Sequence, residues 1–335
     1  FRLDTKRTKR IAIVGHSNDA VYDVTELVQG GVIGDVYEVH ATTNRPIWPQ
    51  GLHRPTEEQK IPKNLDWDLF LGTAQYRPYN EAYHPWSWRA WWDYGTGALG
   101  DMGCHVLDVP FYALQLMYPV KVQSNSTLVN TESAPQASQV VFTFPERKNM
   151  PQLKLVWHDG GLTPERTADM PKGINLEQVN LYIGTKGKII TSNYGENYQV
   201  LMDGYKTPPK TIERVKDHEL GGGRHEMDWV RACKENAGSR KEARSNFDFA
   251  GPLTEMVLMG NLALRLQGLE RELEWDGAKQ AFKNIGGGEK LKLITSHIYK
   301  KENMQPSFKT NYMEVDALEF ANEMIKHNYR KGWKW

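Results

Sequence analysis

Five short apolar segments in the middle of the chain constrain its fold more than any other feature. They cover residues 121–130, 139–144, 153–158, 179–183 and 188–191, and each is bounded by turn-forming residues. The last two flank Gly184-Thr-Lys-Gly187, which predicts a hairpin turn. Short connections join antiparallel neighbours, because a parallel pair needs a crossover of about a dozen residues or more. The sequence therefore predicts an α/β fold of the α+β kind, with a large, mostly antiparallel sheet flanked by helices.

Helical and extended patterns occur on both sides of these segments. Apolar spacing of three to four residues predicts helices over 21–30, 101–117, 225–234, 253–266 and 315–329. Further strands are expected over 36–43 and 273–276, with irregular chain over 52–82 apart from an ordered island at 65–72. The segment from 277 to 314 shows no clear period and is expected to be loosely built.

The N-terminal segment contains an apolar run that does not alternate. Ile11-Ala-Ile-Val14 reads as a strand buried on both faces, and the residues that follow Gly15 lack a G-x-G-x-x-G fingerprint. We therefore assign residues 1–33 as the remnant of a nucleotide-binding Rossmann domain and 34–335 as a substrate-binding and oligomerisation α/β domain. The strand needs a partner for its backbone groups, which we expect from a Rossmann segment upstream of Phe1 or from a neighbouring chain.

Composition limits the classes of partner. The 335 residues include 42 Lys and Arg against 41 Asp and Glu, so no net field attracts nucleic acid or an anionic membrane. No apolar run approaches the roughly 20 residues of a membrane-spanning helix. Two cysteines, Cys104 and Cys233, give no disulfide framework. We expect neutral small molecules or protein surfaces as partners, and both the periplasm and the cytoplasm remain open as compartments.

A glycine-rich turn over residues 95–100 precedes a helix that we expect to open at Asp101. Asp101, His105 and Asp108 then fall at i, i+4 and i+7 on one helical face. A carboxylate in the first turn is favoured by the helix dipole and can hold the histidine in one tautomer, which is a general acid/base arrangement. The alternative is an N-capping aspartate followed by a packed histidine. A metal site on these three is disfavoured, because two carboxylates and one histidine along one helix give a poor closed geometry.

An aromatic run lies directly upstream. Residues 83–94 contain four Trp and two Tyr in twelve positions, more than a core segment requires. Such side chains offer flat apolar faces with polar edges, which suit the CH faces and hydroxyls of a sugar ring. We expect Asp101 and His105 to lie in a cleft lined by Trp88, Trp91 or Trp92.

Three motifs resemble those of the glucose–fructose oxidoreductase/inositol dehydrogenase/MocA (Gfo/Idh/MocA) family, in a branch common in Bacteroidetes. They are Asn-Arg-Pro-Ile-Trp-Pro-Gln-Gly at 44–51, Trp-Trp-Asp-Tyr-Gly-Thr-Gly-Ala-Leu-Gly-Asp-Met-Gly-Cys-His at 91–105 and Ser-Asn-Phe-Asp-Phe-Ala-Gly-Pro at 245–252. Members of this family pair a nicotinamide-binding Rossmann domain with a C-terminal α/β domain. The open face of the large sheet in the second domain often forms the oligomer contact.

By this resemblance, Asp101 and His105 match the catalytic pair of the second domain. His105 would take the hydroxyl proton as hydride passes to the nicotinamide, and Asp101 would orient His105. The substrate-binding positions implied are Arg45, Trp48, Trp88, Trp91, Trp92, Asp108, His158 and His225. The Rossmann fingerprint and the Glu-Lys-Pro lysine of the family are expected upstream of Phe1, so no cofactor-binding residue is assigned in this chain.

The resemblance implies an NAD- or NADP-dependent oxidoreductase that acts on a CH–OH group of a sugar, glycoside or cyclitol and forms a homo-oligomer. Two alternatives remain open. One is a cofactor-free carbohydrate-binding or assembly protein built on the same fold. The other is a glycosidase or lyase that acts through transient oxidation.

Overall fold

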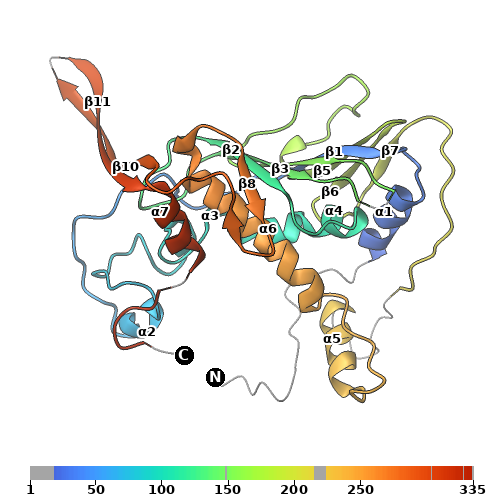
Figure 1. Ribbon diagram of the computed structural model, residues 1–335, viewed down its shortest axis with the longest axis horizontal. Helices are drawn as coiled ribbons and strands as arrows, with labels where there is room; N and C mark the ends of the chain where they lie inside the picture. Colours follow the sequence, from blue (N-terminus) through green and yellow to red (C-terminus); the bar gives the residue numbers. More distant parts are fainter. Residues whose placement is uncertain (1–18, 148, 215–223, 303, 327, 334–335) are drawn as a thin grey trace.

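The computed structural model describes residues 19–147, 149–214, 224–302, 304–326 and 328–333, and a nine-stranded sheet is its central element (Figure 1). The strands are β1 (Val36–Thr42), β2 (Lys121–Ser126), β3 (Ser138–Phe144), β4 (Leu153–His158), β5 (Val179–Gly184), β6 (Lys188–Ser192), β7 (Gln199–Leu201), β8 (Leu273–Asp276) and β9 (Ala281–Phe282). Their spatial order is β7-β6-β5-β1-β4-β3-β2-β8-β9. All neighbours pair antiparallel except β1 and β4, which are parallel. The expected mostly antiparallel sheet is confirmed.

The hairpin turn expected at Gly184-Thr-Lys-Gly187 is also confirmed. It joins β5 to β6, and the amide of Gly184 donates to the carbonyl of Gly187 at 2.9 Å. Gly184 also lies close to the backbone of Ile33, where a Cβ would approach the Ile33 carbonyl oxygen to 2.2 Å. Glycine is therefore required at this turn for the close approach of two chain segments.

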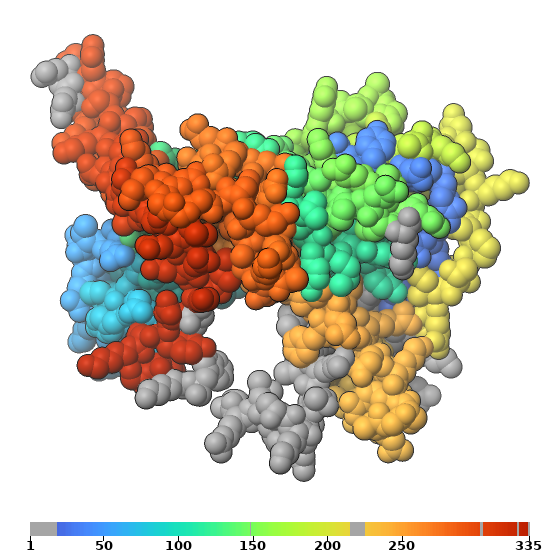
Figure 2. Space-filling model, in the orientation of Figure 1, coloured from blue at the N-terminus to red at the C-terminus, as the bar shows by residue number. Residues whose placement is uncertain are grey.

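The helices are α1 (Asp19–Gln29), α2 (Trp67–Leu71), α3 (Gly97–Val106), α4 (Asp108–Ala113), α5 (Arg224–Lys234), α6 (Phe247–Arg265) and α7 (Ala317–Ile325), with short 3-10 turns η1 (Ser87–Ala90), η2 (Leu176–Gln178) and η3 (Gln267–Leu269). Helices α1, α3, α4 and α6 lie along one face of the sheet, and α5 extends away from it (Figure 1). Side chains such as Tyr22, Leu107, Phe142, Trp157 and Met256 form one continuous core between these helices and the strands. In the space-filling view the molecule is hollowed below the sheet, between the red C-terminal residues and α5 (Figure 2).

Residues 101–117 do not form the single helix expected from the sequence. Helix α3 begins at Gly97 and ends at Val106, and α4 begins at Asp108. Pro110 explains the break, because it has no amide hydrogen to donate to the carbonyl of Val106. Because α3 begins at Gly97, Asp101 lies in its second turn. This position is outside the first turn, in which the helix dipole acts most strongly on a carboxylate.

Residues 290–316 are also more ordered than expected. They form a long hairpin of β10 (Lys290–Glu302) and β11 (Gln305–Asp316) that projects from the body of the protein (Figure 1). Both faces of β11 are mostly exposed, so its sequence carries no strong alternation between apolar and polar residues. Helix α6 begins earlier than expected and α7 is shorter than the expected 315–329, while the predicted strand at 11–14 lies outside the described residues.

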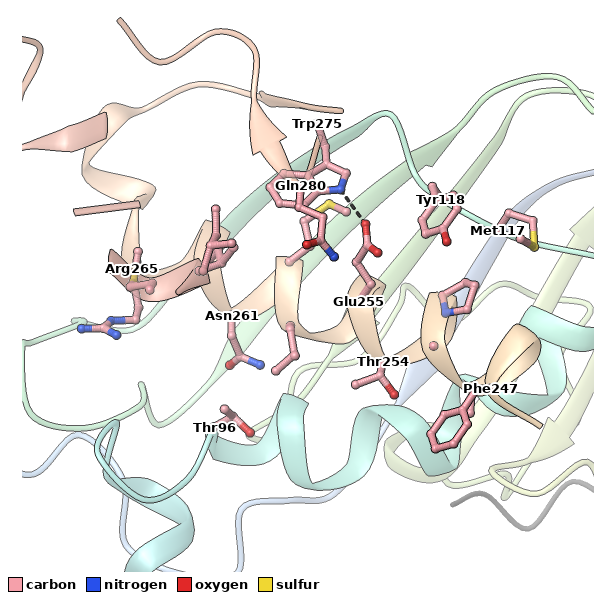
Figure 3. Close-up of a pocket in the computed structure, with 18 of the residues that line it drawn as sticks. Thr96, Met117, Tyr118, Phe247, Thr254, Glu255, Asn261, Arg265, Trp275 and Gln280 are labelled. Carbon is pink, nitrogen blue, oxygen red and sulfur yellow. Dashed lines mark hydrogen bonds between the residues drawn. The ribbon is translucent and has the colours of Figure 1, made fainter. Parts of the chain in front are cut away.

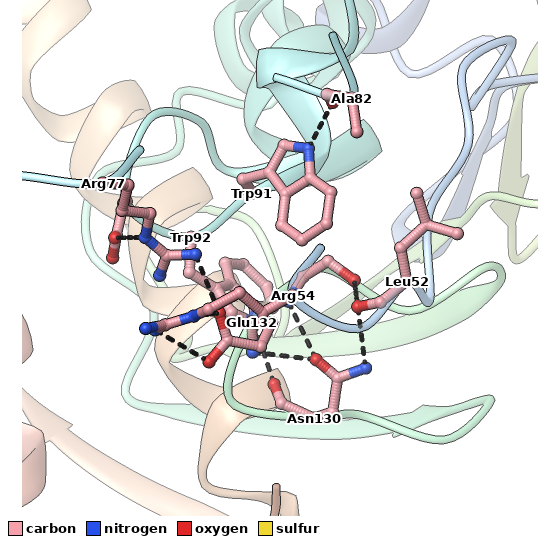
Figure 4. Close-up of polar contacts among 10 residues, drawn as sticks. Leu52, Arg54, Arg77, Ala82, Trp91, Trp92, Asn130 and Glu132 are labelled. Atoms are coloured by element: carbon pink, nitrogen blue, oxygen red, sulfur yellow. Dashed lines mark hydrogen bonds and ion pairs between the residues drawn. The ribbon is translucent and has the colours of Figure 1, made fainter. Parts of the chain in front are cut away.

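Polar contacts hold the chain between β1 and α3, which has little regular structure (Figure 4). Arg77 is 6% exposed, and its Nε and Nη1 donate to Asp93 at 2.5 Å and Glu132 at 2.8 Å. Arg54 binds the same Glu132 carboxylate through two nitrogens, at 2.9 and 3.1 Å. The amide of Trp92 donates to the Glu132 carbonyl at 3.0 Å. This Arg77 network fixes the position of the aromatic run relative to the 130–134 segment.

A chain of three titratable groups crosses β1 and β4 on the face of the sheet opposite α3. Nδ1 of His40 lies 2.9 Å from Nε2 of His158, and Nε2 of His40 lies 2.8 Å from Oε1 of Glu38. His158 is 2% exposed, and burial, together with the charge of His40, lowers its pKa to about 4. The neighbouring Asp159 carboxyl has its pKa raised to about 6 by burial, although Trp157 and Ser138 donate hydrogen bonds to it.

Replacing Arg77 with methionine should lower the free energy of unfolding by about 3 kcal/mol, because Glu132 and Asp93 would lose a buried counter-ion. The matched control is Arg54→Met, whose side chain is 58% exposed and binds the same carboxylate. It should cost less than about 1 kcal/mol. Urea unfolding followed by circular dichroism measures both. Equal losses for the two variants would contradict the assigned role of Arg77.

The low pKa of His158 should make stability depend on pH. The unfolded chain binds this proton below about pH 6.5 and the folded chain only below about pH 4, so the contribution is complete above 6.5 and is lost as pH falls through this window. The loss approaches about 3 kcal/mol. The raised pKa of Asp159 has the opposite effect, since its contribution is lost as pH rises toward 6. The measurement is therefore the unfolding free energy of wild type minus that of His158→Gln between pH 4 and 7.5. A difference that stays constant would refute the prediction.

Candidate functional site

Asp101 lies on the outer side of α3 and binds an arginine of the aromatic run. Nε of Arg89, in η1, donates to Oδ1 of Asp101 at 3.0 Å. The guanidinium carbon of Arg89 lies 4.2 Å from the ring centre of Trp86, 4.6 Å from Trp88 and 5.7 Å from Trp48. Both members of the ion pair are partly exposed, at 20% for Arg89 and 25% for Asp101. The pair is therefore accessible to solvent and bordered by indole rings.

His105 follows Asp101 by one helical turn and is exposed. Its ring packs edge-on against Tyr194, with centroids 6.3 Å apart. Within the described ranges neither ring nitrogen has a hydrogen-bond partner, and the carboxylate of Asp101 binds Arg89 instead. The side chains share one face of α3, as the spacing predicts, but the structure has no direct hydrogen bond between them. A neutral imidazole with a free nitrogen is available to accept a proton.

The structure separates the four predicted tryptophans into two kinds. Trp91 is 0% exposed and Trp48 is 5% exposed, and both pack in a cluster with Trp67 and Tyr83. Nε1 of Trp91 donates to the Ala82 carbonyl at 2.8 Å. These two rings belong to the core of the segment, so among the three tryptophans expected as alternatives at the cleft, Trp91 does not reach the surface.

Trp88 and Trp92 are half-buried and reach the surface. Trp88 covers Arg89, whereas Nε1 of Trp92 donates to the Asn130 carbonyl at 3.1 Å. Sequence reasoning missed Trp86, which is 51% exposed and lies closest to the Arg89 guanidinium. Its position three residues before an arginine in a short helical turn is the signal that could have identified it.

The other predicted substrate positions are dispersed. Arg45 is half-buried, and its Nη1 donates to Asn44 at 2.6 Å. Asp108 is 3% exposed after the break between α3 and α4, where its charge adds to burial in raising the pKa of Tyr182. His158 faces the side of the sheet away from α3, and His225 is half-buried in the first turn of α5. The structure does not bring these four residues together with His105 in one pocket.

A cavity of about 910 Å³ lies beside this region, along α6 (Figure 3). It is lined by Trp92, Gly95, Thr96, Met117, Tyr118, Phe247, Asp248, Ala250, Gly251, Pro252, Thr254, Glu255, Leu258, Met259, Asn261, Leu262, Arg265, Trp275, Gln280, Met324 and Ile325. The motif at 245–252 contributes to one end of it. Asp101 and His105 do not line this cavity.

Two classes of feature are not found in the part of the chain that the structure describes. No group of three His, Cys, Asp or Glu side chains there is arranged to hold a metal ion. No helix within the described ranges is long and apolar enough to span a bilayer.

Comparisons with known proteins find one matching family model. Residues 17–150 match the family model described as the C-terminal alpha/beta domain of an oxidoreductase family, GFO_IDH_MocA_C2. No curated protein sequence matches the chain.

Solved structures of low sequence identity align with most of the chain at TM-scores below 0.5. The WlbA dehydrogenase from Bordetella pertussis, in complex with NADH and UDP-GlcNAcA, aligns with a TM-score of 0.45 and 12% identity over 80% of this chain and 64% of its own. An aldose-aldose oxidoreductase from Caulobacter crescentus aligns with a TM-score of 0.42 and 15% identity over 79% of this chain and 64% of its own. A levoglucosan dehydrogenase in complex with NADH and L-sorbose aligns with a TM-score of 0.44 and 15% identity over 80% of this chain and 67% of its own.

The chain thus spans less than two thirds of the length of the first two of these structures, at 64% of each. The family match covers the strand β1, the aromatic run, α3 and α4, the part of the chain that carries Arg89, Asp101 and His105. Residues 17–150, less than half of the chain, match the model of the C-terminal alpha/beta domain of the Gfo/Idh/MocA oxidoreductase family.

Proposed function

We propose that this chain provides the substrate-binding and acid–base part of an NAD- or NADP-dependent oxidoreductase that acts on a CH–OH group of a sugar, glycoside or cyclitol. The observation that carries the proposal is the Arg89–Asp101 ion pair, bordered by exposed indoles and one helical turn from the free imidazole of His105. These residues lie in the part of the chain that matches the oxidoreductase family.

The described residues do not themselves fit a dinucleotide cofactor. Among them, no glycine-rich turn leads from a parallel strand into a helix to cradle a pyrophosphate, since β1 is followed by the Pro-rich loop that begins at Asn44. We therefore propose that the nicotinamide binds a Rossmann segment other than the described residues.

His105 is the proposed general base. Its unpaired ring nitrogen accepts the proton of the substrate hydroxyl and becomes an imidazolium. The carboxylate of Asp101 lies one turn earlier on the same face of α3, and Arg89 holds it in place. Because Arg89 already neutralises Asp101, this part of the site presents little net charge, which suits a neutral sugar.

The indoles of Trp86 and Trp88 are the proposed platform for the sugar ring. Both flank Arg89, and Trp86 is 51% exposed. An indole face contacts the CH side of a pyranose, while the ring hydroxyls remain free for polar groups.

A cofactor-free carbohydrate-binding protein is the second candidate. The absence of a pyrophosphate cradle from the described residues favours it, and the same indole platform would serve it. Fluorescence titration with NADH, on this chain alone and with a Rossmann segment supplied, separates the candidates. Binding in neither case favours the second candidate, and binding only with the added segment favours the oxidoreductase.

Replacing His105 with glutamine should lower kcat for sugar oxidation by about 10²- to 10⁴-fold, because the proton acceptor is lost. KM should change little. Trp86→Ala should instead raise KM by about tenfold, which corresponds to the loss of about 1.4 kcal/mol of stacking. Reduction of NAD or NADP, followed by absorbance with a panel of sugars and cyclitols, measures both constants. His53→Gln is the control, since His53 is a histidine outside the proposed site whose Nε2 hydrogen-bonds with the backbone of His297 in β10. Unchanged kcat in His105→Gln would exclude the proposed base.

We further propose that the face of the sheet opposite α3 forms a homo-oligomer contact. Val141 and Val156 lie there beside the exposed Lys154 and Gln123, and the small core around Leu181 covers only the β5–β6 part of this face. A charge on this surface would oppose association of two copies.

Val141→Glu should accordingly convert the oligomer to a monomer at micromolar concentration. Light scattering coupled to size exclusion measures the mass, and Lys283→Glu, on an exposed residue outside this face, is the control. A wild-type protein that is already monomeric would contradict this contact.

A further inference from the structure

The cavity along α6 presents one face of that helix. Thr254, Leu258, Asn261 and Arg265 recur at the spacing of a single helical stripe, and all four line the cavity. Its volume of about 910 Å³ lies within the range of small-molecule sites, roughly 300 to 1,000 Å³. Arg265 and Asn261 lie toward one end of it, and Phe247 and Met117 toward the other (Figure 3).

Arg265 is a half-buried cation without a counter-ion in contact. Its guanidinium carbon lies 5.3 Å from the ring centre of Trp92 and 5.0 Å from that of Phe320. Across the described ranges, no side chain or carbonyl accepts a hydrogen bond from its nitrogens. Burial lowers the pKa of Arg265 to about 10, against the opposing charge of Asp93. The flanking rings favour the positive charge, and its N–H donors remain open to a ligand.

The nearby carboxylates are already engaged by other arginines. Arg77 donates to Asp93 at 2.5 Å and to Glu132 at 2.8 Å, and Arg54 donates to Glu132 at 2.9 and 3.1 Å. The region around Trp92 therefore contains the guanidinium groups of Arg54, Arg77 and Arg265 and only two carboxylates, those of Asp93 and Glu132. The surplus positive charge falls on Arg265.

The two acidic residues that line the cavity, Asp248 and Glu255, do not neutralise Arg265, because both precede it by ten residues or more on α6. Glu255 precedes Arg265 by ten residues on the same helix, a separation of about 15 Å along the axis. Its Oε1 accepts a hydrogen bond from Nε1 of Trp275 at 2.9 Å. The cavity thus has a positive end and a negative end.

A second unsatisfied group lies next to Arg265. Asn261, one turn earlier, is 6% exposed, and its Oδ1 has no hydrogen-bond partner in the described structure. Its Nδ2 makes only a long contact of 3.3 Å with the Val257 carbonyl. Buried polar groups are normally paired, so the Oδ1 of Asn261 calls for a hydrogen-bond donor such as a ligand hydroxyl, whereas the N–H donors of Arg265 call for an acceptor.

We propose that Arg265 binds the anionic group, a carboxylate or a phosphate, of a small organic ligand whose neutral body lies along α6 against Trp92, Leu258 and Met259. The planar guanidinium presents paired N–H donors that match the geometry of either group. The site is separate from the proposed sugar-oxidising site, because Asp101 and His105 do not line the cavity.

The test uses the full chain with three probes at equal ionic strength: sodium glucuronate, glucose 6-phosphate and neutral glucose. Calorimetry measures affinity, and the ¹⁵Nε–¹H resonance of Arg265 reports contact directly. We expect at least one anionic probe to bind at least about tenfold more tightly than glucose and to shift the Arg265 resonance to saturation. The probe that binds more tightly identifies carboxylate or phosphate as the natural group.

Variants test whether Arg265 is the residue that binds the anionic probe. Arg265→Gln should weaken the preferred anion about tenfold or more, whereas Arg265→Lys should weaken it less because the charge remains. Arg271→Gln is the matched control, since Arg271 is another half-exposed arginine near the end of α6 and pairs with Glu289 at 2.7 Å. The control should bind as wild type does.

The proposal is overturned if neither anion moves the Arg265 resonance in wild type. An equal loss of affinity in Arg271→Gln and Arg265→Gln would also overturn it, because the attraction would then be general to the surface charge. The resonance titration on wild type decides the matter even if Arg265→Gln fails to fold. Unchanged binding by a variant of His105 separates this site from the proposed catalytic one.

Discussion

The close approach of α3 to α6 determines which sides of these two helices are left to carry candidate functional side chains. A Cβ at Gly103 would come within 2.9 Å of both methyl carbons of Val257, and a Cβ at Gly260 would come within 2.6 Å of Leu99. Only glycine at these two positions permits the two helices to pack at this distance, and their contact lies over the core of the sheet. One side of α3 is consequently fixed against α6, so the side with Asp101 and His105 faces outward. The stripe of α6 that ends at Arg265 likewise faces away from the sheet.

The chain between β1 and α3 has few backbone ladders to position it, and buried ion pairs do this instead. Arg77 joins Asp93 to Glu132, while Asn130 accepts hydrogen bonds from the amides of Glu132 and Ser133 and donates to the Leu52 carbonyl. A charge taken out of water is stable only when its partners are fixed, so this network tolerates few arrangements of the chain. The aromatic run that it holds therefore behaves as part of a rigid scaffold, as a binding surface requires.

The sequence predicts those elements whose formation depends on neighbouring residues in the chain. Strands β4 to β6 and the Gly184 hairpin follow from apolar runs and a turn that the neighbouring residues specify by themselves. The hairpin at 290–316 was missed because most of β11 is exposed on both faces and its sequence carries no burial pattern. The start of α3 was missed because Gly97 and Gly100 are poor helix formers, so the local sequence does not signal a helix there.

The candidate site shows the same division. The one-face arrangement of Asp101 and His105 is a property of helical spacing, so the sequence predicts it. Which tryptophan reaches solvent depends on tertiary contacts that place Trp91 in the core and Trp86 outside it, so composition alone cannot separate them. The break at Leu107 removes Asp108 from the stripe, and Pro110, which stands in the sequence within the expected helix, is the signal that could have predicted it.

The aromatic run of residues 83–94 contacts two arginines, Arg89 and Arg265. They differ in whether a carboxylate contacts the guanidinium. Trp86 and Trp88 flank Arg89, whose charge is neutralised by Asp101 at 3.0 Å. Trp92 flanks Arg265, which has no carboxylate in contact because Arg77 engages the nearest one. An arginine that is already paired gains little from a ligand anion, whereas an unpaired one exchanges its weak hydration for a charge-assisted hydrogen bond. The same indole chemistry therefore suits a neutral ring on one side of α3 and an anionic group at the end of α6.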